Sequence, residues 1–296
     1  MTGDSGNLGG VILAVCVPFL NEHEHLPAFL ASLAAQTRVP DRLLLVDDGS
    51  TDGSHEAAAE FAATHSWARL VRRPARTAER DRLATAKELE AFQWAIGQLD
   101  VEWDVVGKLD ADLRLTPRTL ETILAELERD DKLGLAGSFL QESGQRIRIG
   151  AGHVHGATKF FRRACWDDIA PVPPILGWDT IDESTARLRG WRTQSFAMPD
   201  GDPEHLRPRG THDGLLRGYR RWGECSYALG ESPLHVALYT LRQMATERPR
   251  LAGGASYAAG YAGAALRRAP RAEADVRASV RREQKQRLKA RMLRIP

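Results

Sequence analysis

Continuous apolar runs alternate with stretches of helical period through the first half of the chain. A run without interspersed polar residues is typical of a parallel strand buried on both faces. The spacing of Leu26, Phe29 and Leu33 is typical of one buried helix face. The regular alternation of the two patterns predicts a doubly wound α/β unit. The predicted strands are residues 11–17, 42–46, 70–71 and 103–108, and the predicted helices are 26–35, 53–64 and 84–99.

The same alternation predicts a helix over residues 117–129 and strands over 133–139 and 147–149. Residues 150–208 are richer in Gly, Pro and Trp, which predicts loops arranged around a site, with a helix over 182–189 as their clearest element.

The character of the chain changes again near its C-terminus. Residues 234–244 have a helical pattern, and residues 251–266 form an apolar segment of small residues that is too short to span a bilayer but could lie on one. We therefore predict two parts, a nucleotide-binding and catalytic domain over residues 1–230 and a helical extension with a basic tail over 231–296.

Composition indicates an ordinary globular protein, with 43% hydrophobic and 27% charged residues in 296. The three cysteines have no CxxC or CxxH spacing, so neither a disulfide framework nor a zinc site is indicated. With no apolar leader and no run of about 18 apolar residues, we expect a cytoplasmic protein.

Charge is unevenly distributed behind a net value of +2. Residues 267–296 contain 11 basic and 3 acidic residues, while the rest of the chain is acidic. A basic tail on an acidic body could meet an anionic membrane surface, or it could simply be solvated.

Three predicted strands end in polar or acidic groups, which sheet topology should bring to one edge. Five carboxylates in these groups would repel one another unless a cation lay among them. A Mg²⁺ or Mn²⁺ site uses one or two carboxylates plus substrate phosphates, which points to a nucleotide diphosphate ligand. The groups are PFLNE at 18–22, Asp47 and Asp48 after the second strand, and Asp110 and Asp112 after VVGKL.

The tripeptide DAD at 110–112 by itself leaves three interpretations open: a metal site, a plain turn, or the nucleophile of a dehalogenase-type phosphatase. The phosphatase pattern normally continues with Thr or Val two residues after the second Asp, whereas Leu113 and Arg114 follow here. Lys108, just before the acids, has no predicted role.

The combination of this tripeptide with other motifs favours one of these three interpretations, the metal site. Residues 18–22, Gln36-Thr37 with Pro40, the turn VDDGSTD at 46–52 and DAD at 110–112 resemble, in order and spacing, the family 2 glycosyltransferases. The resemblance covers about residues 11–230. It implies an α/β fold of GT-A type, in which helices flank a doubly wound, mostly parallel sheet and a C-terminal helical extension follows.

The resemblance also implies roles for individual residues. The acids of the turn border the nucleotide, Asp110 lies near the ribose, and Asp112 holds a divalent metal that bridges the diphosphate. Because GT-A enzymes often complete the metal site with one histidine, His205 is our first choice and His212 our second. The predicted nucleotide-sugar-binding residues are Pro18, Asn21, Glu22, Asp47, Asp48, Arg80 and Asp110, and the predicted metal ligands are Asp112 and His205.

Group transfer to a hydroxyl also needs a base. In similar family 2 enzymes a Glu-Asp pair opens a helix that ends at a Gly-aromatic pair, and counting back from Gly190-Trp191 puts Asp179 on that Asp. This chain departs from the pattern with Trp178 in place of the Glu. Asp182 lies one helical turn further on and is the alternate; Asp179 could also be only a helix cap.

We therefore expect a metal-dependent, inverting glycosyltransferase that moves a sugar from a nucleotide diphosphate donor to a saccharide or lipid-linked hydroxyl acceptor. A role in envelope polysaccharide or glycolipid synthesis would fit, with peripheral association at the inner face of the plasma membrane and no nucleic-acid partner. One alternative is a nucleotidyltransferase, which would carry a Gly-rich loop after the first strand. The other is a non-catalytic nucleotide-sugar-binding protein, which the replacement of the usual Glu by Trp178 would favour.

Overall fold

The computed structural model describes residues 10–74, 85–150, 152–207, 214–246 and 249–292. The chain divides into two compact units. Unit 1 comprises Met1–Thr77, Ala91–Asp168 and Arg192–Leu206, and unit 2 comprises Ala78–Glu90, Ile169–Trp191 and Arg207–Pro296. The prediction of separate domains meeting at residue 230 stays a prediction.

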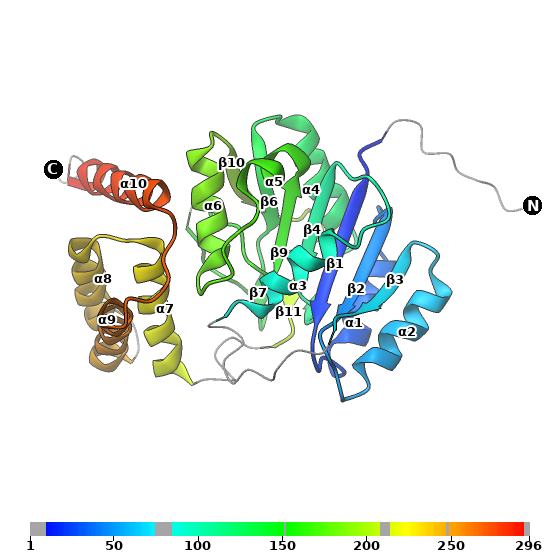
Figure 1. Ribbon diagram of the computed structural model, residues 1–296, viewed down its shortest axis with the longest axis horizontal. Helices are drawn as coiled ribbons and strands as arrows, with labels where there is room; N and C mark the ends of the chain where they lie inside the picture. Colours follow the sequence, from blue (N-terminus) through cyan, green and yellow to red (C-terminus); the bar gives the residue numbers. More distant parts are fainter. Residues whose placement is uncertain (1–9, 75–84, 151, 208–213, 247–248, 293–296) are drawn as a thin grey trace, which may run out of the picture. The chain divides into compact units, whose positions relative to one another are not determined.

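Within the described residues, unit 1 contains a seven-stranded sheet in the order β10-β6-β9-β4-β1-β2-β3. Figure 1 shows β1, β2 and β3 side by side, with α2 next to β3. The strands are β1 (Leu13–Phe19), β2 (Arg42–Asp47), β3 (Ala68–Arg72), β4 (Val105–Leu109), β6 (Leu133–Ser138), β9 (Thr158–Arg162) and β10 (Arg192–Phe196), and the helices are α1 (Leu26–Ala34), α2 (Ser54–Thr64), α4 (Thr119–Arg129) and α5 (Arg163–Ile169).

The core of unit 1 follows from the apolar runs. Leu13, Val15 and Val17 of β1 are fully buried and belong to one cluster with Phe29 and Leu33 of α1. Each such side chain contributes about 1.5–3 kcal/mol through its removal from water. The doubly wound, mostly parallel sheet predicted from the sequence is therefore confirmed, and its parallel strands end at one edge.

One strand of this sheet runs against the others. β9 lies antiparallel between β4 and β6, so the prediction of a loop there was wrong, as it was at α5 and β10. Gly107 faces Phe160 across the pair, and a Cβ at Gly107 would lie 2.5 Å from the Phe160 ring. The short run TKFFR was the available signal, but Gly and Pro nearby outweighed it.

A second, small sheet in the order β5-β11-β7-β8 lies in the same unit. Ser143 and Gly144, with φ of 50° and 75°, form the two-residue turn of its hairpin. The predicted strand at 147–149 was wrong, because the apolar Ile147 follows the hairpin and is buried in the core rather than paired in a ladder. The strands are β5 (Leu113–Arg114), β7 (Gln141–Glu142), β8 (Gln145–Arg146) and β11 (Glu204–His205).

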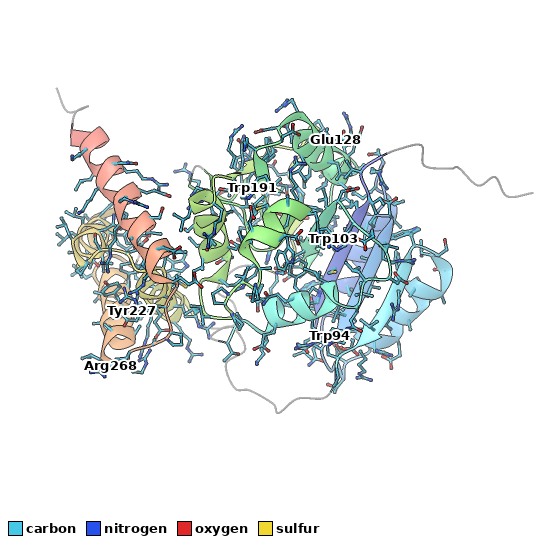
Figure 2. All side chains as sticks on the ribbon, turned by 45° about the horizontal axis from the view of Figure 1, so that its top comes forward. Trp94, Trp103, Glu128, Trp191, Tyr227 and Arg268 are labelled. Atoms are coloured by element: carbon cyan, nitrogen blue, oxygen red, sulfur yellow. The ribbon has the colours of Figure 1, made fainter. Side chains whose placement is uncertain are left out.

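Unit 2 is helical. Tyr227, labelled in Figure 2, lies among its helices with its ring edge-on to Tyr261 at 5.7 Å and under the guanidinium of Arg271 at 4.5 Å. The unit contains α6 (Trp178–Leu188), α7 (Leu215–Leu229), α8 (Pro233–Thr246), α9 (Arg250–Leu266) and α10 (Ala274–Met292). α3 (Lys87–Ile96) begins in unit 2 and continues into unit 1.

The small-residue segment predicted over 251–266 is the packing seam of α9. A Cβ at Gly223 of α7 would lie 1.9 Å from the Tyr257 carbonyl oxygen, and one at Gly260 would lie 1.9 Å from the Arg220 carbonyl oxygen. These glycines therefore let the backbones of α7 and α9 approach closely. No helix in the described part of the chain is both long and apolar enough to cross a membrane.

Candidate active site at the carboxyl ends of the strands

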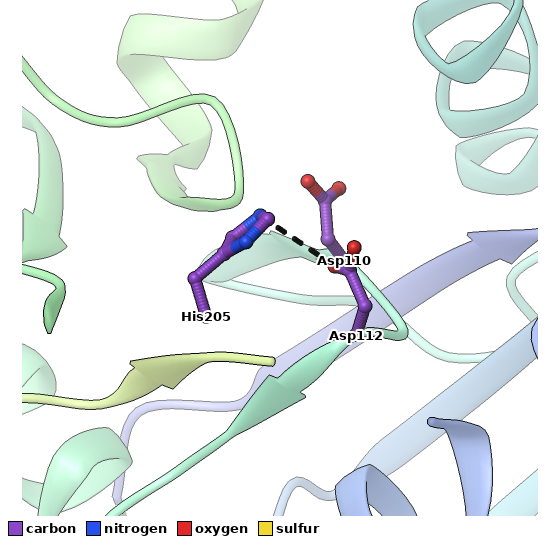
Figure 3. A group of neighbouring side chains, drawn as sticks. All are labelled: Asp110, Asp112 and His205. Atoms are coloured by element: carbon purple, nitrogen blue, oxygen red, sulfur yellow. Dashed lines mark ion pairs between the residues drawn. The ribbon is translucent and has the colours of Figure 1, made fainter. Parts of the chain in front are cut away.

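Asp110 and Asp112 follow β4 directly, and the short strand β5 begins at the next residue. β11 pairs antiparallel with β5, with His205 opposite Leu113, and the Leu206 amide donates to the Asp112 carbonyl at 2.8 Å. The small sheet thereby brings a histidine more than 90 positions further along the chain against the DAD tripeptide. The His205 Nε2 to Asp112 Oδ1 distance is 3.7 Å (Figure 3).

Asp110, Asp112 and His205 form a group that could hold a divalent metal ion. One ligand atom from each side chain lies within 4.8 Å of the others. Two carboxylate oxygens and an imidazole nitrogen suit Mn²⁺ or Mg²⁺, leaving coordination positions for phosphate oxygens. The structure thus brings together the residues that the sequence predicted for the metal and the adjoining ribose.

The structure gives Lys108 a role that the sequence did not suggest. Its side chain is 2% exposed, and its ammonium donates to the Asp110 carboxylate and, at 3.0 Å, to the Gly156 carbonyl. A buried ammonium needs such partners. Lys108 therefore orients Asp110 and offsets part of its charge; the signal in the sequence was a lysine inside an otherwise apolar strand.

The loop after β1 is tied to the turn after β2 by polar contacts. Asn21, with φ of 55°, accepts the Thr51 amide at 2.9 Å through its side chain and donates its own amide to Ser50 Oγ at 3.1 Å. The Glu22 amide donates to Ser54 Oγ at 2.8 Å. Asn tolerates the left-handed conformation better than most residues. It can therefore occupy this position, and its two hydrogen bonds hold the loop after β1 against the turn after β2.

Asp47 organises the β2 turn from a fully buried position. It accepts the amides of Gly49 and Ser50 at 3.0 and 2.7 Å, and it contacts His55 and Arg72 at 2.8 and 3.1 Å. Burial would raise the pKa of this carboxyl, but hydrogen bonds from Ser50, His55 and Gly49 hold the pKa below its usual value. The geometry supports a turn-holding role; contact with a nucleotide stays a prediction.

Other predicted binding residues line the same strand ends. Asp48 pairs with the mostly buried Arg73 at 2.7 Å. Pro18 lies two residues beyond Cys16, where pairing between β1 and β4 ends, so its missing N–H interrupts no ladder on that side. Arg80 and His212 lie outside the described residues.

The predicted base belongs to unit 2. Gly177, with φ of 84°, precedes α6, Asp179 lies half-buried in the first turn, and Asp182 is 1% exposed with its Oδ1 accepting the Glu183 amide at 2.6 Å. Trp178, which stands where a Glu was expected, is buried and donates from Nε1 to Glu88 Oε1 at 3.0 Å. Trp178 is therefore anchored by a carboxylate from α3.

The sheet topology and the acidic group beyond its strands define a class, the GT-A type glycosyltransferases. Residues 14–174 match the family model described as glycosyl transferase family 2, more than half of the chain. The chain belongs to this family. Among curated protein sequences none matches this chain.

Solved structures share the fold at low sequence identity. The mannosyltransferase PcManGT from Pyrobaculum calidifontis, in complex with GDP-Man and Mn²⁺, is 19% identical with a TM-score of 0.56, covering 87% of this chain and 76% of that chain. Residues 1–349 of S. aureus TarS in complex with UDP-GlcNAc are 16% identical with a TM-score of 0.57, covering 80% and 74%. At these identities the likeness shows the GT-A fold.

Proposed function

We propose that the protein transfers a sugar from a nucleotide diphosphate donor to a hydroxyl acceptor with inversion at the anomeric carbon. The observation that carries the proposal is the Asp110, Asp112 and His205 group at the carboxyl ends of the sheet. Family membership supports sugar transfer, and the GDP-Man, UDP-GlcNAc and Mn²⁺ bound by structures of the same fold support a nucleotide-sugar donor with a divalent metal.

In this proposal Asp112 and His205 hold the cation and Asp110, oriented by Lys108, lies on the ribose side. A cation held there would neutralise charge on the departing diphosphate. The acceptor oxygen forms a bond to the anomeric carbon as the bond from that carbon to the diphosphate oxygen breaks. The proton of the acceptor hydroxyl passes to a carboxylate, and the nucleoside diphosphate leaves with the bonding electron pair.

Asp179 is the proposed acceptor of that proton. Asp179 is half-buried in the first turn of α6, whereas Asp182 is buried and already accepts a backbone amide. A general base must come within hydrogen-bond reach of the proton that it removes. This supports Asp179 over Asp182.

A thermal-shift panel of UDP-, GDP- and dTDP-sugars with and without Mn²⁺ tests donor binding. A ligand that binds only the folded state raises the melting temperature by mass action. We expect one nucleotide to raise it in the presence of Mn²⁺ and much less in its absence. No shift with any nucleotide sugar would contradict the proposal, and donor binding without transfer or donor hydrolysis would favour the non-catalytic alternative. Release of pyrophosphate from a sugar phosphate and a nucleoside triphosphate would indicate a nucleotidyltransferase.

We also propose that the protein binds an anionic membrane surface, which would present a lipid-linked acceptor to it. Within the described residues, the exposed large apolar side chains all lie on α7 to α10. Leu234, Leu238 and Leu241 are spaced four and three residues apart, which makes one stripe on α8, and Arg242 is the single charge among the exposed described side chains of that helix. An apolar stripe beside an arginine suits insertion among anionic headgroups.

Vesicle flotation tests this surface. We expect the full chain to float with phosphatidylglycerol vesicles and much less with phosphatidylcholine vesicles, and Leu238→Asp with Leu241→Asp to abolish flotation. Ala31→Asp with Ala34→Asp on α1 adds the same charge at two exposed positions and serves as the matched control. Equal flotation of the double variant and the control would overturn this part of the proposal.

A further inference from the structure

A cavity of about 250 Å³ lies within unit 2, between the start of α6 and helices α7, α8 and α9. α7 contributes Trp222, Cys225, Ser226 and Leu229, which are three, four and seven residues apart from the first and so share one helix face. This face is a continuous wall of the cavity. All of the lining residues lie beyond residue 174, outside the part of the chain that matches the family model.

Aromatic rings form much of this lining. Trp222 is 51% exposed at the cavity, and Tyr239 of α8 and Tyr257 of α9 lie with ring centroids 4.9 Å apart. An aromatic face is apolar while a tyrosine hydroxyl at the ring edge is a hydrogen-bonding group. A sugar ring has the complementary character, with C–H groups on its faces and hydroxyls around its edge.

Glu231 supplies a carboxyl group at the wall. Gly230, with φ of 84°, ends α7, and the Glu231 amide donates to the Ser226 carbonyl at 3.0 Å, which turns the chain back toward the cavity. Ser226 Oγ and the Tyr257 hydroxyl are 2.8 Å apart, and both groups hydrogen-bond the Glu231 side chain. The cavity therefore offers a carboxyl and two hydroxyls that form one network, able to donate to and accept from ligand hydroxyls.

The charges around Glu231 favour a hydroxylated ligand over a cation. Burial raises the pKa of Glu231, while the charges of His235 and Arg287 and the hydrogen bonds from Ser226 and Tyr257 act in the opposite direction. His235 also lines the cavity, one helical turn from Tyr239. An additional cation would meet these positive groups, whereas neutral hydroxyls would not.

The cavity adjoins the start of α6, where Gly177 and Thr180 line it on either side of Asp179 in the sequence. Burial, followed by the negative charge of Asp179, raises the pKa of the Cys225 thiol in the cavity wall. The volume is below the roughly 300–1,000 Å³ of pockets for drug-sized ligands, which suits a single sugar ring. We propose that this cavity binds a sugar ring of the acceptor, an inference that rests on the proposed function in assigning the sugar to the acceptor side.

Saturation-transfer NMR on the full chain, with methyl glycosides of glucose, galactose, mannose and N-acetylglucosamine, tests the cavity directly. We expect at least one glycoside to bind, with Kd raised about tenfold or more by Glu231→Gln and by Trp222→Ala, and largely restored in Trp222→Phe. Glu273→Gln, exposed just before α10, and Trp94→Ala, on α3 and not part of the lining, are the matched controls and should leave Kd unchanged. Circular dichroism melting of each variant checks that it folds.

The Mn²⁺-dependent melting shift with a nucleotide sugar separates this inference from the proposed function. If that shift persists in Glu231→Gln while glycoside binding is lost, both stand. If the shift is absent in wild type but glycosides still bind at these residues, the proposed function fails and the sugar pocket stands. Three results would overturn the pocket: no glycoside bound by wild type, unchanged Kd in Glu231→Gln and Trp222→Ala, or displacement of the glycoside by tetramethylammonium, which would indicate a cation site.

Discussion

In unit 1 Asp47 ends the parallel strand β2, and Asp110 and Asp112 follow the end of the parallel strand β4. In unit 2 Glu231 instead follows the end of a helix and lines a cavity between helices. Asp47 accepts hydrogen bonds from backbone amides and contacts His55 and Arg72, and its pKa is lowered despite burial. Glu231 has the hydroxyls of Ser226 and Tyr257 together with His235 and Arg287 near it, and burial outweighs their effect and raises its pKa. The pKa values of these two acids are therefore shifted in opposite directions, because their surroundings differ.

On the proposed function, this difference corresponds to a division of work between donor and acceptor. In the proposed function the strand-end carboxylates of unit 1 and His205 hold a cation, which would neutralise the charge of a diphosphate donor. The cavity of unit 2 offers aromatic faces, hydroxyls and a carboxyl group, which suit the acceptor sugar that we propose there. In the proposed mechanism unit 1 acts on the leaving group, while Asp179 of unit 2 acts on the attacking group.

The largest effect is expected from Asp179→Asn, which removes the proposed base from unit 2. Loss of general base catalysis should lower the transfer rate about 10²–10⁴-fold, while the Mn²⁺-dependent melting shift with the nucleotide sugar persists. Single-turnover transfer rates and thermal shift measure the two. Retained turnover would move the role to Asp182, and loss of the melting shift would contradict the division between units.

Asp112→Asn should impair donor binding rather than proton removal, because it removes a proposed metal ligand of unit 1. We expect kcat/KM for transfer to fall about 10²–10³-fold and the melting shift with Mn²⁺ and donor to disappear, because a neutral amide holds the cation poorly. Glycoside binding to the unit 2 cavity should persist. Asp131→Asn, at an exposed position of unit 1, is the matched control; an equal loss in both variants would contradict a specific metal role.

Lys108→Met tests how unit 1 holds its acids. Removing a buried ammonium leaves the Gly156 carbonyl and one side of Asp110 without a donor, so the free energy of unfolding should fall by about 1–3 kcal/mol. Urea unfolding measures this, with Lys132→Met at an exposed position as the control. Equal stability of Lys108→Met and wild type would show that the ion pair does not hold the strand end.

The smallest effects concern pH, and they should have opposite signs in the two units. The lowered pKa of Asp47 adds stability that is present above its unfolded value of about 4 and is lost as pH falls through the folded pKa. Asp47→Asn should therefore be less stable than wild type near neutral pH, and the difference should shrink in acid.

For Glu231 the raised pKa adds stability that is fully present below its unfolded value of about 4.3 and is lost as pH rises through the folded pKa. Glu231→Gln should therefore gain stability relative to wild type as pH rises. Unfolding free energies of both variants over a pH series measure the two slopes. Slopes of the same sign would remove the contrast between the units.

Much of unit 1 followed from the sequence, because its elements are locally encoded. Continuous apolar runs such as the one ending at Phe19 require burial on both faces, and parallel strands necessarily end at one sheet edge. The order of apolar runs and acids is therefore enough to predict that Asp47, Asp48, Asp110 and Asp112 share that edge. β9 escaped prediction, because the short run TKFFR gave no period long enough to outweigh the surrounding Gly and Pro.

By itself the sequence determined the sheet, the acidic strand ends and the change in character near the C-terminus, since each depends on neighbouring residues. Only the tertiary structure showed the contacts between residues that lie far apart in the sequence. The β5-β11 ladder brings His205 to Asp112, the ammonium of Lys108 finds Asp110 and Gly156, and glycines at Gly223 and Gly260 let α7 and α9 close one side of a cavity. Helix faces and short ladders carry little local signal, because their partners lie tens of residues away and only packing selects them.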